Sequence, residues 1–320
     1  MSNYIDRILE LLRTNPNVET FVLKQNSKDS KDRELLRLNI ENKTARTIRK
    51  TVLTAIDNFT KHQDEVIENE QSYEKYNTSQ HVMYYADPLS EEIKSLNMFN
   101  ILDSPPEELT SPDAIEGLIK GYFFRISFTN CNIWAFQKVA NNCITNSKKM
   151  TFHGSTLKEI KGRLYQFSNN VEFLLFDDML LFKNDNTLAS HFGFDVLIKR
   201  RAEETLKKIS DSGLLSDMEK VLEHYSKNEK TYGKKLMIAR NSRVIHISRN
   251  ELKAVVSQSR SYSRIIKFNQ NDEIEIKNKK DVDNLFKLLN DQILVSEITS
   301  IVYDTASKNE ILSEKTIDSK

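Results

Sequence analysis

The alternation of hydrophobic and polar residues along the chain predicts short helices and strands in its first third. Over residues 5–13, isoleucines and leucines recur at the spacing of one apolar helix face. Residues 20–25 and 35–40 instead alternate apolar and polar side chains, as two paired strands do. A second apolar stripe at helical spacing predicts a longer helix over residues 46–66.

Two antiparallel hairpins are predicted in the middle of the chain. Residues 121–128 and 132–139 are largely apolar runs separated by a short turn, and residues 171–176 and 179–182 repeat this arrangement around Asp177–Asp178. Aspartate favours such turns because its side chain bonds the local backbone and tolerates left-handed geometry. The sequence therefore predicts two β-hairpins.

Helical spacing dominates the last part of the chain. Residues 188–257 are predicted to be mostly helical. Two short strands are predicted beyond them, over residues 264–268 and 273–276, and residues 281–289 are predicted to form a further helix.

These elements describe an α+β chain with small mixed or antiparallel sheets and flanking helices. The 7 glycines and 5 prolines are few, which disfavours an all-β sandwich built on tight turns. A length of 320 residues is sufficient for two modest domains. Because Asp103–Pro106 is typical of a linker and a new block of strands follows it, we place the boundary near residue 118, between domains 1–118 and 119–320.

The cysteines and the apolar segments predict where the protein works. Cys131 and Cys143 are too few for a disulfide framework and fit free thiols in a reducing cytosol. The first residues lack the basic and then apolar layout of a signal peptide. The longest apolar run, residues 171–181, is short and is interrupted by acids. We therefore expect a cytoplasmic protein that reaches the inner membrane face only through a partner.

The net charge of +1 conceals two segments of opposite sign. Residues 57–116 hold fourteen acidic residues against three basic ones, whereas residues 227–267 hold eleven basic residues against two acidic ones. The basic segment can attract a polyanion, and the acidic segment can dock a basic partner. Both segments also fit ordinary solvated helix faces.

The basic segment, residues 227–267, is the strongest candidate for a binding surface. Tyrosines and serines accompany its cations, and these residue types contact sugars, bases and phosphate oxygens in nucleic-acid complexes. The candidate DNA-binding residues are Lys234, Lys235, Arg240, Arg243, Arg249, Lys253, Arg260, Arg264 and Lys267. The tyrosines are Tyr225, Tyr232 and Tyr262, and the serines are Ser248, Ser257, Ser259, Ser261 and Ser263. No zinc finger or clear helix-turn-helix motif occurs, so we expect salt-dependent contacts to the DNA backbone with little sequence selectivity.

Two groups of acids suggest metal-dependent chemistry as an alternative. Asp177–Asp178 could hold a divalent cation at the end of a strand, but nothing nearby supplies a third ligand and a turn explains both residues. Glu275 and Lys277 match the Glu-x-Lys half of a nuclease signature, in which the acid binds Mg²⁺ and the lysine positions water. The acid that should precede them could only be Asp272 or Glu273, both very close in sequence.

No other motif points to an enzyme. The six histidines are scattered, without the i, i+4 spacing of a helical zinc site. The chain lacks a glycine-rich phosphate loop and a nucleophile elbow. We therefore expect a non-enzymatic protein without metal or cofactor, and keep a metal-dependent nuclease as the alternative.

Three segments together resemble the KwaB-like family of the Kiwa anti-phage defence system. The first, residues 171–184, holds the second predicted hairpin, and the second is Lys253–Val256. The third and most specific, residues 285–308, contains Leu-Leu-Asn-Asp, then Leu-x-Ser-x-Ile-Thr, then Tyr and Ser-Lys. Mild departures are Gln292–Ile293, where an acidic or aromatic pair is expected, and Ile298, where leucine is usual. The family-motif residues are Asp177, Asp178, Asn290, Asp291, Ser296, Tyr303 and Lys308.

The resemblance, which covers about residues 120–312, implies a cytoplasmic homo-oligomer built on a dimer. Such a protein would associate with a small multi-span membrane protein, KwaA, and would bind DNA to impede phage replication or transcription. Its motif residues need not touch DNA, because turn chemistry explains Asn290–Asp291, while Tyr303 would pack and Lys308 would pair with an acid. The acidic segment suits the basic cytoplasmic loops of a membrane partner.

Overall fold

The structure is a computed structural model of the chain. It describes residues 4–14, 16–25, 33–62, 65–66, 69–72, 82–86, 91–110, 119–139, 149–153, 156–160, 167–177, 179–295 and 302–304. Of the residues singled out in the sequence, Cys143, Asp178, Ser296, Ile298 and Lys308 lie outside these ranges.

The chain forms two compact units, and the α+β class is confirmed. The first unit comprises Met1–Tyr73 and Gln80–Gly193, and the second comprises Glu74–Ser79 and Phe194–Lys320. The main boundary between the two units therefore falls between Gly193 and Phe194, not near residue 118 as we expected. The reason is that strands from both sides of residue 118 pair within one sheet.

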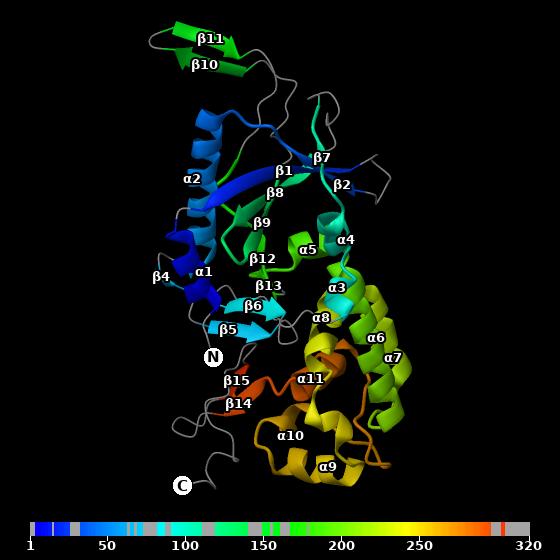
Figure 1. The fold of residues 1–320 in the computed structure, drawn as a ribbon. Coiled ribbons are helices and arrows are strands. Elements are labelled where there is room, and N and C mark those ends of the chain that lie inside the picture. Colours follow the sequence, from blue (N-terminus) through cyan, green and yellow to red (C-terminus); the bar gives the residue numbers. More distant parts are fainter. Residues whose placement is uncertain are drawn as a thin grey trace, which may run out of the picture. The chain divides into compact units, whose positions relative to one another are not determined.

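The first unit is built on a nine-stranded mixed sheet, larger than the small sheets that we expected (Figure 1). Its order is β5-β6-β13-β12-β9-β8-β1-β2-β7. The strands are β1 (Asn17–Gln25), β2 (Arg33–Arg37), β5 (Asn69–Ser72), β6 (Val82–Ala86), β7 (Glu107–Glu108), β8 (Ile119–Ser127), β9 (Asn132–Lys138), β12 (Phe173–Phe176) and β13 (Met179–Phe182). The central pairs are antiparallel, and only the two edge pairs, β5 with β6 and β2 with β7, are parallel.

The predicted paired strands and both predicted hairpins are confirmed. β1 pairs with β2, β8 with β9 and β12 with β13, all antiparallel. Asp177, at the turn between β12 and β13, has a φ of 50°, which is the left-handed geometry that aspartate tolerates in turns.

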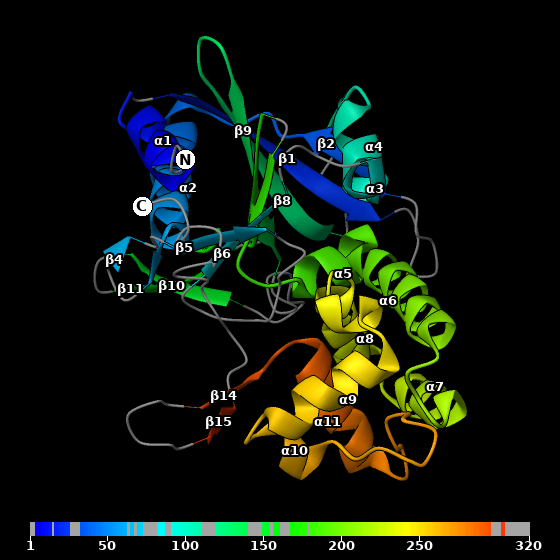
Figure 2. The ribbon, with the colours of Figure 1, turned by 90° about the horizontal axis from the view of Figure 1, so that it is seen from below.

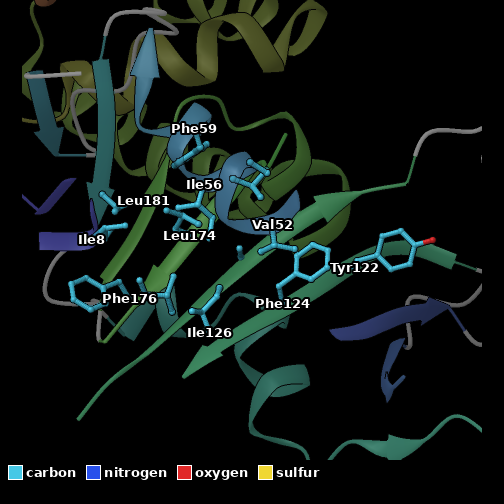
Figure 3. Close-up of a cluster of buried hydrophobic side chains, with 14 of the residues drawn as sticks. Ile8, Val52, Ile56, Phe59, Tyr122, Phe124, Ile126, Leu174, Phe176 and Leu181 are labelled. Atoms are coloured by element: carbon cyan, nitrogen blue, oxygen red, sulfur yellow. The ribbon is translucent and has the colours of Figure 1, made fainter. Parts of the chain in front are cut away.

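Two helices, α1 (Tyr4–Leu12) and α2 (Asn42–Phe59), cover one face of this sheet. Figure 3 shows Val52 and Ile56 of α2 among Phe124 and Leu174 of the strands, all of them buried. The predicted helix over residues 46–66 ends earlier, at Phe59, and two short paired strands follow it, β3 (Lys61–His62) and β4 (Glu65–Val66). Burial of an amphipathic face is what stabilises such helices.

The opposite face of the sheet holds a cluster of aromatic rings. Because side chains alternate along a strand, Phe123 and Phe136 face away from the side that α2 covers. Phe136 stacks on Phe173 with a ring separation of 5.2 Å, and the ring of Phe192 meets both edge-on. Phe192 ends the helix α5 (Asn186–Phe192), so these contacts fix α5 to the sheet.

Three further elements complete the first unit. Two short helices precede β7, namely α3 (Glu91–Lys94) and α4 (Asn97–Asp103). A separate two-stranded hairpin is formed by β10 (Lys149–His153) and β11 (Thr156–Ile160).

The second unit is helical, as the sequence predicts, and Figure 2 shows its helices as one group. Its elements are α6 (Phe194–Ser212), α7 (Met218–Lys227), α8 (Glu229–Ala239), the 3₁₀ turn η3 (Arg243–His246), α9 (Arg249–Gln258), α10 (Tyr262–Ile265), α11 (Lys279–Leu289) and the strand pair β14 (Ile293–Val295) and β15 (Val302–Asp304). Its own apolar core includes Leu206, Leu236, Leu252 and Phe286, which come from four different helices.

The strands predicted over residues 264–268 and 273–276 are wrong in part. Tyr262–Ile265 form the helix α10, and pairing is reduced to isolated bridges of Ile274 with Phe268 and with Leu215. The hydroxyl of Ser259 accepts a hydrogen bond from the backbone N–H of Tyr262 at 3.2 Å. Such local side-chain bonds favour a helical turn over a sheet ladder.

No helix in the described part of the chain is long and apolar enough to cross a membrane.

Candidate nucleic-acid interface

The basic segment, residues 227–267, folds into α8, η3, α9 and α10 of the second unit. Polar side chains begin these elements at defined points. The side chains of Asn228, Ser242 and Ser248 accept hydrogen bonds from the backbone at the starts of α8, η3 and α9. Each such cap stabilises its helix end by about 1 kcal/mol, so the segment presents its cations from regular elements.

Four of the candidate DNA-binding residues are paired with acids. The pairs are Lys235 with Asp283 at 3.5 Å, Arg240 with Glu204 at 3.9 Å, Arg249 with Glu273 at 3.1 Å, and Lys253 with Asp272. All four carboxylates lie outside residues 227–267, so the excess charge of the segment is partly neutralised by the rest of its own unit. Sequence reasoning missed these acids because no local spacing connects them with their partners.

Three arginines of the segment remain exposed without an acid. Arg243, Arg260 and Arg264 form no ion pair with any residue that the structure describes. Lys267 is also exposed, and its Nζ donates to the carbonyl oxygen of Ser263 at 3.0 Å. Lys234 is half-buried in α8. Guanidinium groups in water suit phosphate contacts, because their planar donors match phosphate oxygens.

The structure corrects the expected role of the tyrosines. Tyr225 and Tyr232 are only 7% and 4% exposed, so they are core residues whose rings cannot stack on bases. The hydroxyl of Tyr232 donates to Asp283 at 3.2 Å, and burial together with this carboxylate raises the pKa of Tyr232. The hydroxyl of Tyr262 lies 3.2 Å from Asp291. The segment therefore offers positive charge to DNA, but the rings of Tyr225 and Tyr232 do not stack on its bases.

The serines of the segment mostly serve the fold. Ser248 caps α9, Ser259 bonds the backbone of Tyr262, and Ser261 is 5% exposed. Ser257 is exposed and Ser263 is half-buried. Neutral donors for phosphate oxygens are therefore fewer than the sequence indicated.

The motif Asn290–Asp291 turns the chain after α11, as the turn explanation predicts. Asn290 caps the helix, and its Nδ2 donates to the carbonyl oxygens of Phe286, at 3.0 Å, and of Lys235, at 3.1 Å. Asp291 follows with a φ of 48°. The bond to Lys235 also fastens α11 to α8, so this family motif supports the unit that carries the basic segment.

The candidate metal ligands do not come together in the described part of the chain. Asp177 forms an ion pair with Arg7 at 3.2 Å. Glu275 pairs with Lys277 at 2.8 Å, while Asp272 and Glu273 pair with cations of α9. Among the described residues there is no group of three or more potential ligands for a metal ion.

Comparisons with known proteins agree on one family. The family described as Kiwa protein KwaB-like matches residues 117–299, which is more than half of the chain. Kiwa protein KwaB of Escherichia coli O55:H7 (strain RM12579 / EPEC) is 24% identical over 201 residues, which span 60% of this chain and 63% of that protein. The match thus covers less than two thirds of that relative. No solved structure matches significantly.

Proposed function

The chain belongs to the KwaB-like family of Kiwa proteins, and we propose that it is an anti-phage defence protein that acts by binding DNA without cleaving it. The bound protein would occupy the DNA and so impede phage replication or transcription. The proposed contact surface is the basic segment of the second unit.

The observation that carries this proposal is the set of three exposed arginines that have no acid partner in the described part of the chain, Arg243, Arg260 and Arg264. A cation that already pairs with a carboxylate at about 3 Å adds little to the positive electrostatic potential of the surface. An exposed and unpaired guanidinium displaces a counterion when it meets a DNA phosphate, and this release drives binding at low salt. Since nothing in the segment reads base edges, the expected affinity is similar for unrelated sequences.

The test is duplex binding by fluorescence anisotropy between about 50 and 200 mM salt. Each phosphate contact contributes about −0.9 to the slope of log affinity against log salt. Replacing the three arginines by glutamine is therefore expected to lower the magnitude of that slope by about 3 and to weaken binding at low salt at least tenfold.

The matched control removes three paired cations of the same segment. Lys227, Lys235 and Lys253 pair with Glu223, Asp283 and Asp272. Their replacement by glutamine changes the net charge equally but is expected to reduce the affinity much less. Equal losses in the two triple variants, or no duplex binding by the unaltered protein at low salt, would contradict the proposal.

The absence of catalysis is a separate part of the proposal. It is supported by the ion pairs that engage Asp177, Glu275 and Lys277. Prolonged incubation with phage DNA and Mg²⁺ or Mn²⁺ should leave the DNA intact. Cleavage that disappears in the Glu275→Gln variant would instead establish the nuclease alternative.

We also propose that the protein assembles with itself and with a basic membrane partner of the KwaA type. In support, Glu91, Glu107 and Glu108 are exposed in the first unit. Cytoplasmic loops of membrane proteins are enriched in lysine and arginine, so the charges are complementary. Replacing these glutamates by lysine should prevent co-purification with the partner but leave DNA binding intact, and co-purification of the variant would exclude this surface.

A further inference from the structure

A second group of exposed lysines lies outside the basic segment, in the turn that leads into α11. Residues 277–280 read Lys-Asn-Lys-Lys, and all four are exposed. A capping box fixes the turn. The side chain of Asn278 accepts a hydrogen bond from the backbone N–H of Lys280 at 2.9 Å, and the carboxylate of Asp281 accepts one from the backbone N–H of Lys277 at 2.9 Å. The backbone thus engages the two capping side chains, and the lysine side chains are presented to solvent from a regular structure.

Two of these three lysines have no acid partner among the residues that the structure describes. Lys277 pairs with Glu275 at 2.8 Å. Lys279 and Lys280 form no ion pair with a described residue. The acid next to them in the sequence, Asp281, accepts hydrogen bonds from two backbone N–H groups with its Oδ2. Two exposed ammonium groups are therefore available to an anion from outside the chain.

Hydrogen bonds place this turn beside the end of the basic segment. The backbone N–H of Glu275 donates to the carbonyl oxygen of Lys267 at 2.8 Å. In α11, Nδ2 of Asn284 donates to the carbonyl oxygen of Ile265 at 3.2 Å. Lys280 precedes Asn284 by four residues, so both lie on the same face of α11. Lys280 therefore lies on the side of α11 that meets α10 and the residues following it.

The extended residues before the turn separate an inner side from an outer side. Ile274 and Ile276 are each 2% exposed and belong to the core of the second unit. Because side chains alternate along an extended chain, Glu275 and Lys277 lie on the opposite side, and their ion pair is on the surface. Lys267, whose backbone bonds Glu275, is exposed as well. The lysines of the turn therefore adjoin the exposed cations at the end of the basic segment.

We propose that the DNA contact surface continues beyond residue 267 onto this turn, where Lys279 and Lys280 bind phosphates of the DNA backbone. This inference rests on the proposed DNA binding and adds contacts to it from a part of the chain outside the basic segment. An ammonium group on a flexible stem contacts phosphate oxygens without reading a base, so these contacts suit any sequence. Lys277 contributes less, because Glu275 already pairs with it. Cations from two segments that adjoin only in the folded unit thus act on one polyanion.

Duplex binding by the full chain, followed by fluorescence anisotropy between about 50 and 200 mM salt, tests the inference. The double variant Lys279→Gln with Lys280→Gln should bind at least about fivefold more weakly at low salt. The magnitude of its slope of log affinity against log salt should fall by about 1.8, for two lost phosphate contacts. The matched control is Lys43→Gln with Lys50→Gln. These two lysines of α2 are also exposed and have no acid partner in the described part of the chain, but they lie in the first unit. The control changes the net charge equally and should leave the affinity nearly unchanged.

Chemical protection of the lysines gives a second measurement, which needs no variant. An acetylating activated ester reacts with exposed amines, and mass spectrometry then reports the modified fraction of each lysine. Bound duplex should reduce the acetylation of Lys279 and Lys280 several-fold. The acetylation of Lys43 and Lys50 should not change.

The outcomes distinguish a failure of this inference from a failure of the proposed function. If the unaltered protein binds no duplex at low salt, both are overturned. If it binds, and the triple arginine variant weakens binding while the two double lysine variants have equal affinities, only the extension of the surface is overturned. Unchanged acetylation of Lys279 and Lys280 in the complex would overturn the extension as well.

Discussion

The side chain of Gln137 forms a pair of hydrogen bonds with the backbone of Ser168. Its Nε2 donates to the carbonyl oxygen of Ser168 at 2.7 Å, and its Oε1 accepts from the N–H of Ser168 at 3.0 Å. Nε2 also lies 2.7 Å from the carbonyl oxygen of Asn170. Gln137 is only 3% exposed, so these bonds satisfy a buried amide. They fasten the segment before β12 to the middle of the sheet.

Replacing Gln137 by leucine should destabilise the first unit by about 2–4 kcal/mol, because several backbone groups lose their partner in a buried site. Urea unfolding followed by the fluorescence of Trp134 measures this, since the only tryptophan of the chain lies in β9. Gln258→Leu, at an exposed position of α9, is the control and should leave the midpoint nearly unchanged. A similar midpoint for both variants would show that the Gln137 bonds contribute nothing.

Gly121 allows β8 and β9 to approach each other. A Cβ at this position would lie 2.3 Å from Cζ of Phe136 and 2.7 Å from the carbonyl oxygen of Gln137. Phe136 is fully buried and stacks on Phe173, so the ring has little room to move. Gly121→Ala should therefore cost about 3 kcal/mol by overpacking.

The control for this prediction is Gly193→Ala. Gly193 has a φ of 81°, but apart from Gly193 itself and its two chain neighbours no described atom lies within 4 Å of the position that an alanine methyl group would take, so only backbone strain of about 1 kcal/mol is expected. Both variants are compared by urea unfolding with Trp134 as the probe. If Gly121→Ala proves no more destabilising than Gly193→Ala, the close approach of the Phe136 ring is not a constraint.

The stability of the first unit should depend on pH through His191. The pKa of this imidazole is lowered from 6.5 to about 4 in the folded state. Between these values the unfolded chain binds a proton that the folded chain does not, so stability decreases as the pH falls from 6.5 towards 4. Allowing for solvent screening of a half-buried group, the loss is at most about 2 kcal/mol.

Unfolding free energies of the unaltered chain and of His191→Gln, measured over this range in phosphate-free buffers, check the pH prediction. The variant should show a flatter dependence because it lacks the titrating ring. Parallel curves for the two proteins would mean that His191 does not titrate in this way. The dependence of stability on pH would then come from other titrating groups.

The elements that the sequence predicted correctly are those whose information is local. The hairpin of β12 and β13 follows from two apolar runs around Asp177, and the turn after α11 follows from Asn290–Asp291, because turn residues act on their own backbone. The domain boundary could not be found in this way. β1 pairs with β8 across about a hundred residues, and no spacing pattern records such a partner.

The candidate interface shows the same limit. The sequence located the basic residues, but their state depends on acids far along the chain, such as Glu204 for Arg240 and Asp283 for Lys235. Likewise, Tyr232 is indistinguishable in the sequence from an exposed ring, although it packs on Phe286 with a ring separation of 5.2 Å. Ion pairs with acids distant in the sequence therefore leave only some of the nine candidate cations available to a ligand.

The ion pairs of the basic segment lead to a prediction of increased DNA binding. Asp272 neutralises Lys253 and has a φ of 61°. Asparagine has the same shape and tolerates left-handed geometry, so Asp272→Asn should release Lys253 without disturbing the turn. If the basic segment binds phosphates, the variant should bind duplex DNA several-fold more tightly at low salt. Its slope of log affinity against log salt should be steeper by about 0.9, for one added phosphate contact.

The matched control is Asp177→Asn. This variant also changes an aspartate at positive φ, 50°, and releases an arginine, Arg7, but in the first unit. The two variants carry the same net charge, so a gain confined to Asp272→Asn would locate the DNA contact near Lys253, whereas equal gains would mean that total charge alone determines the affinity.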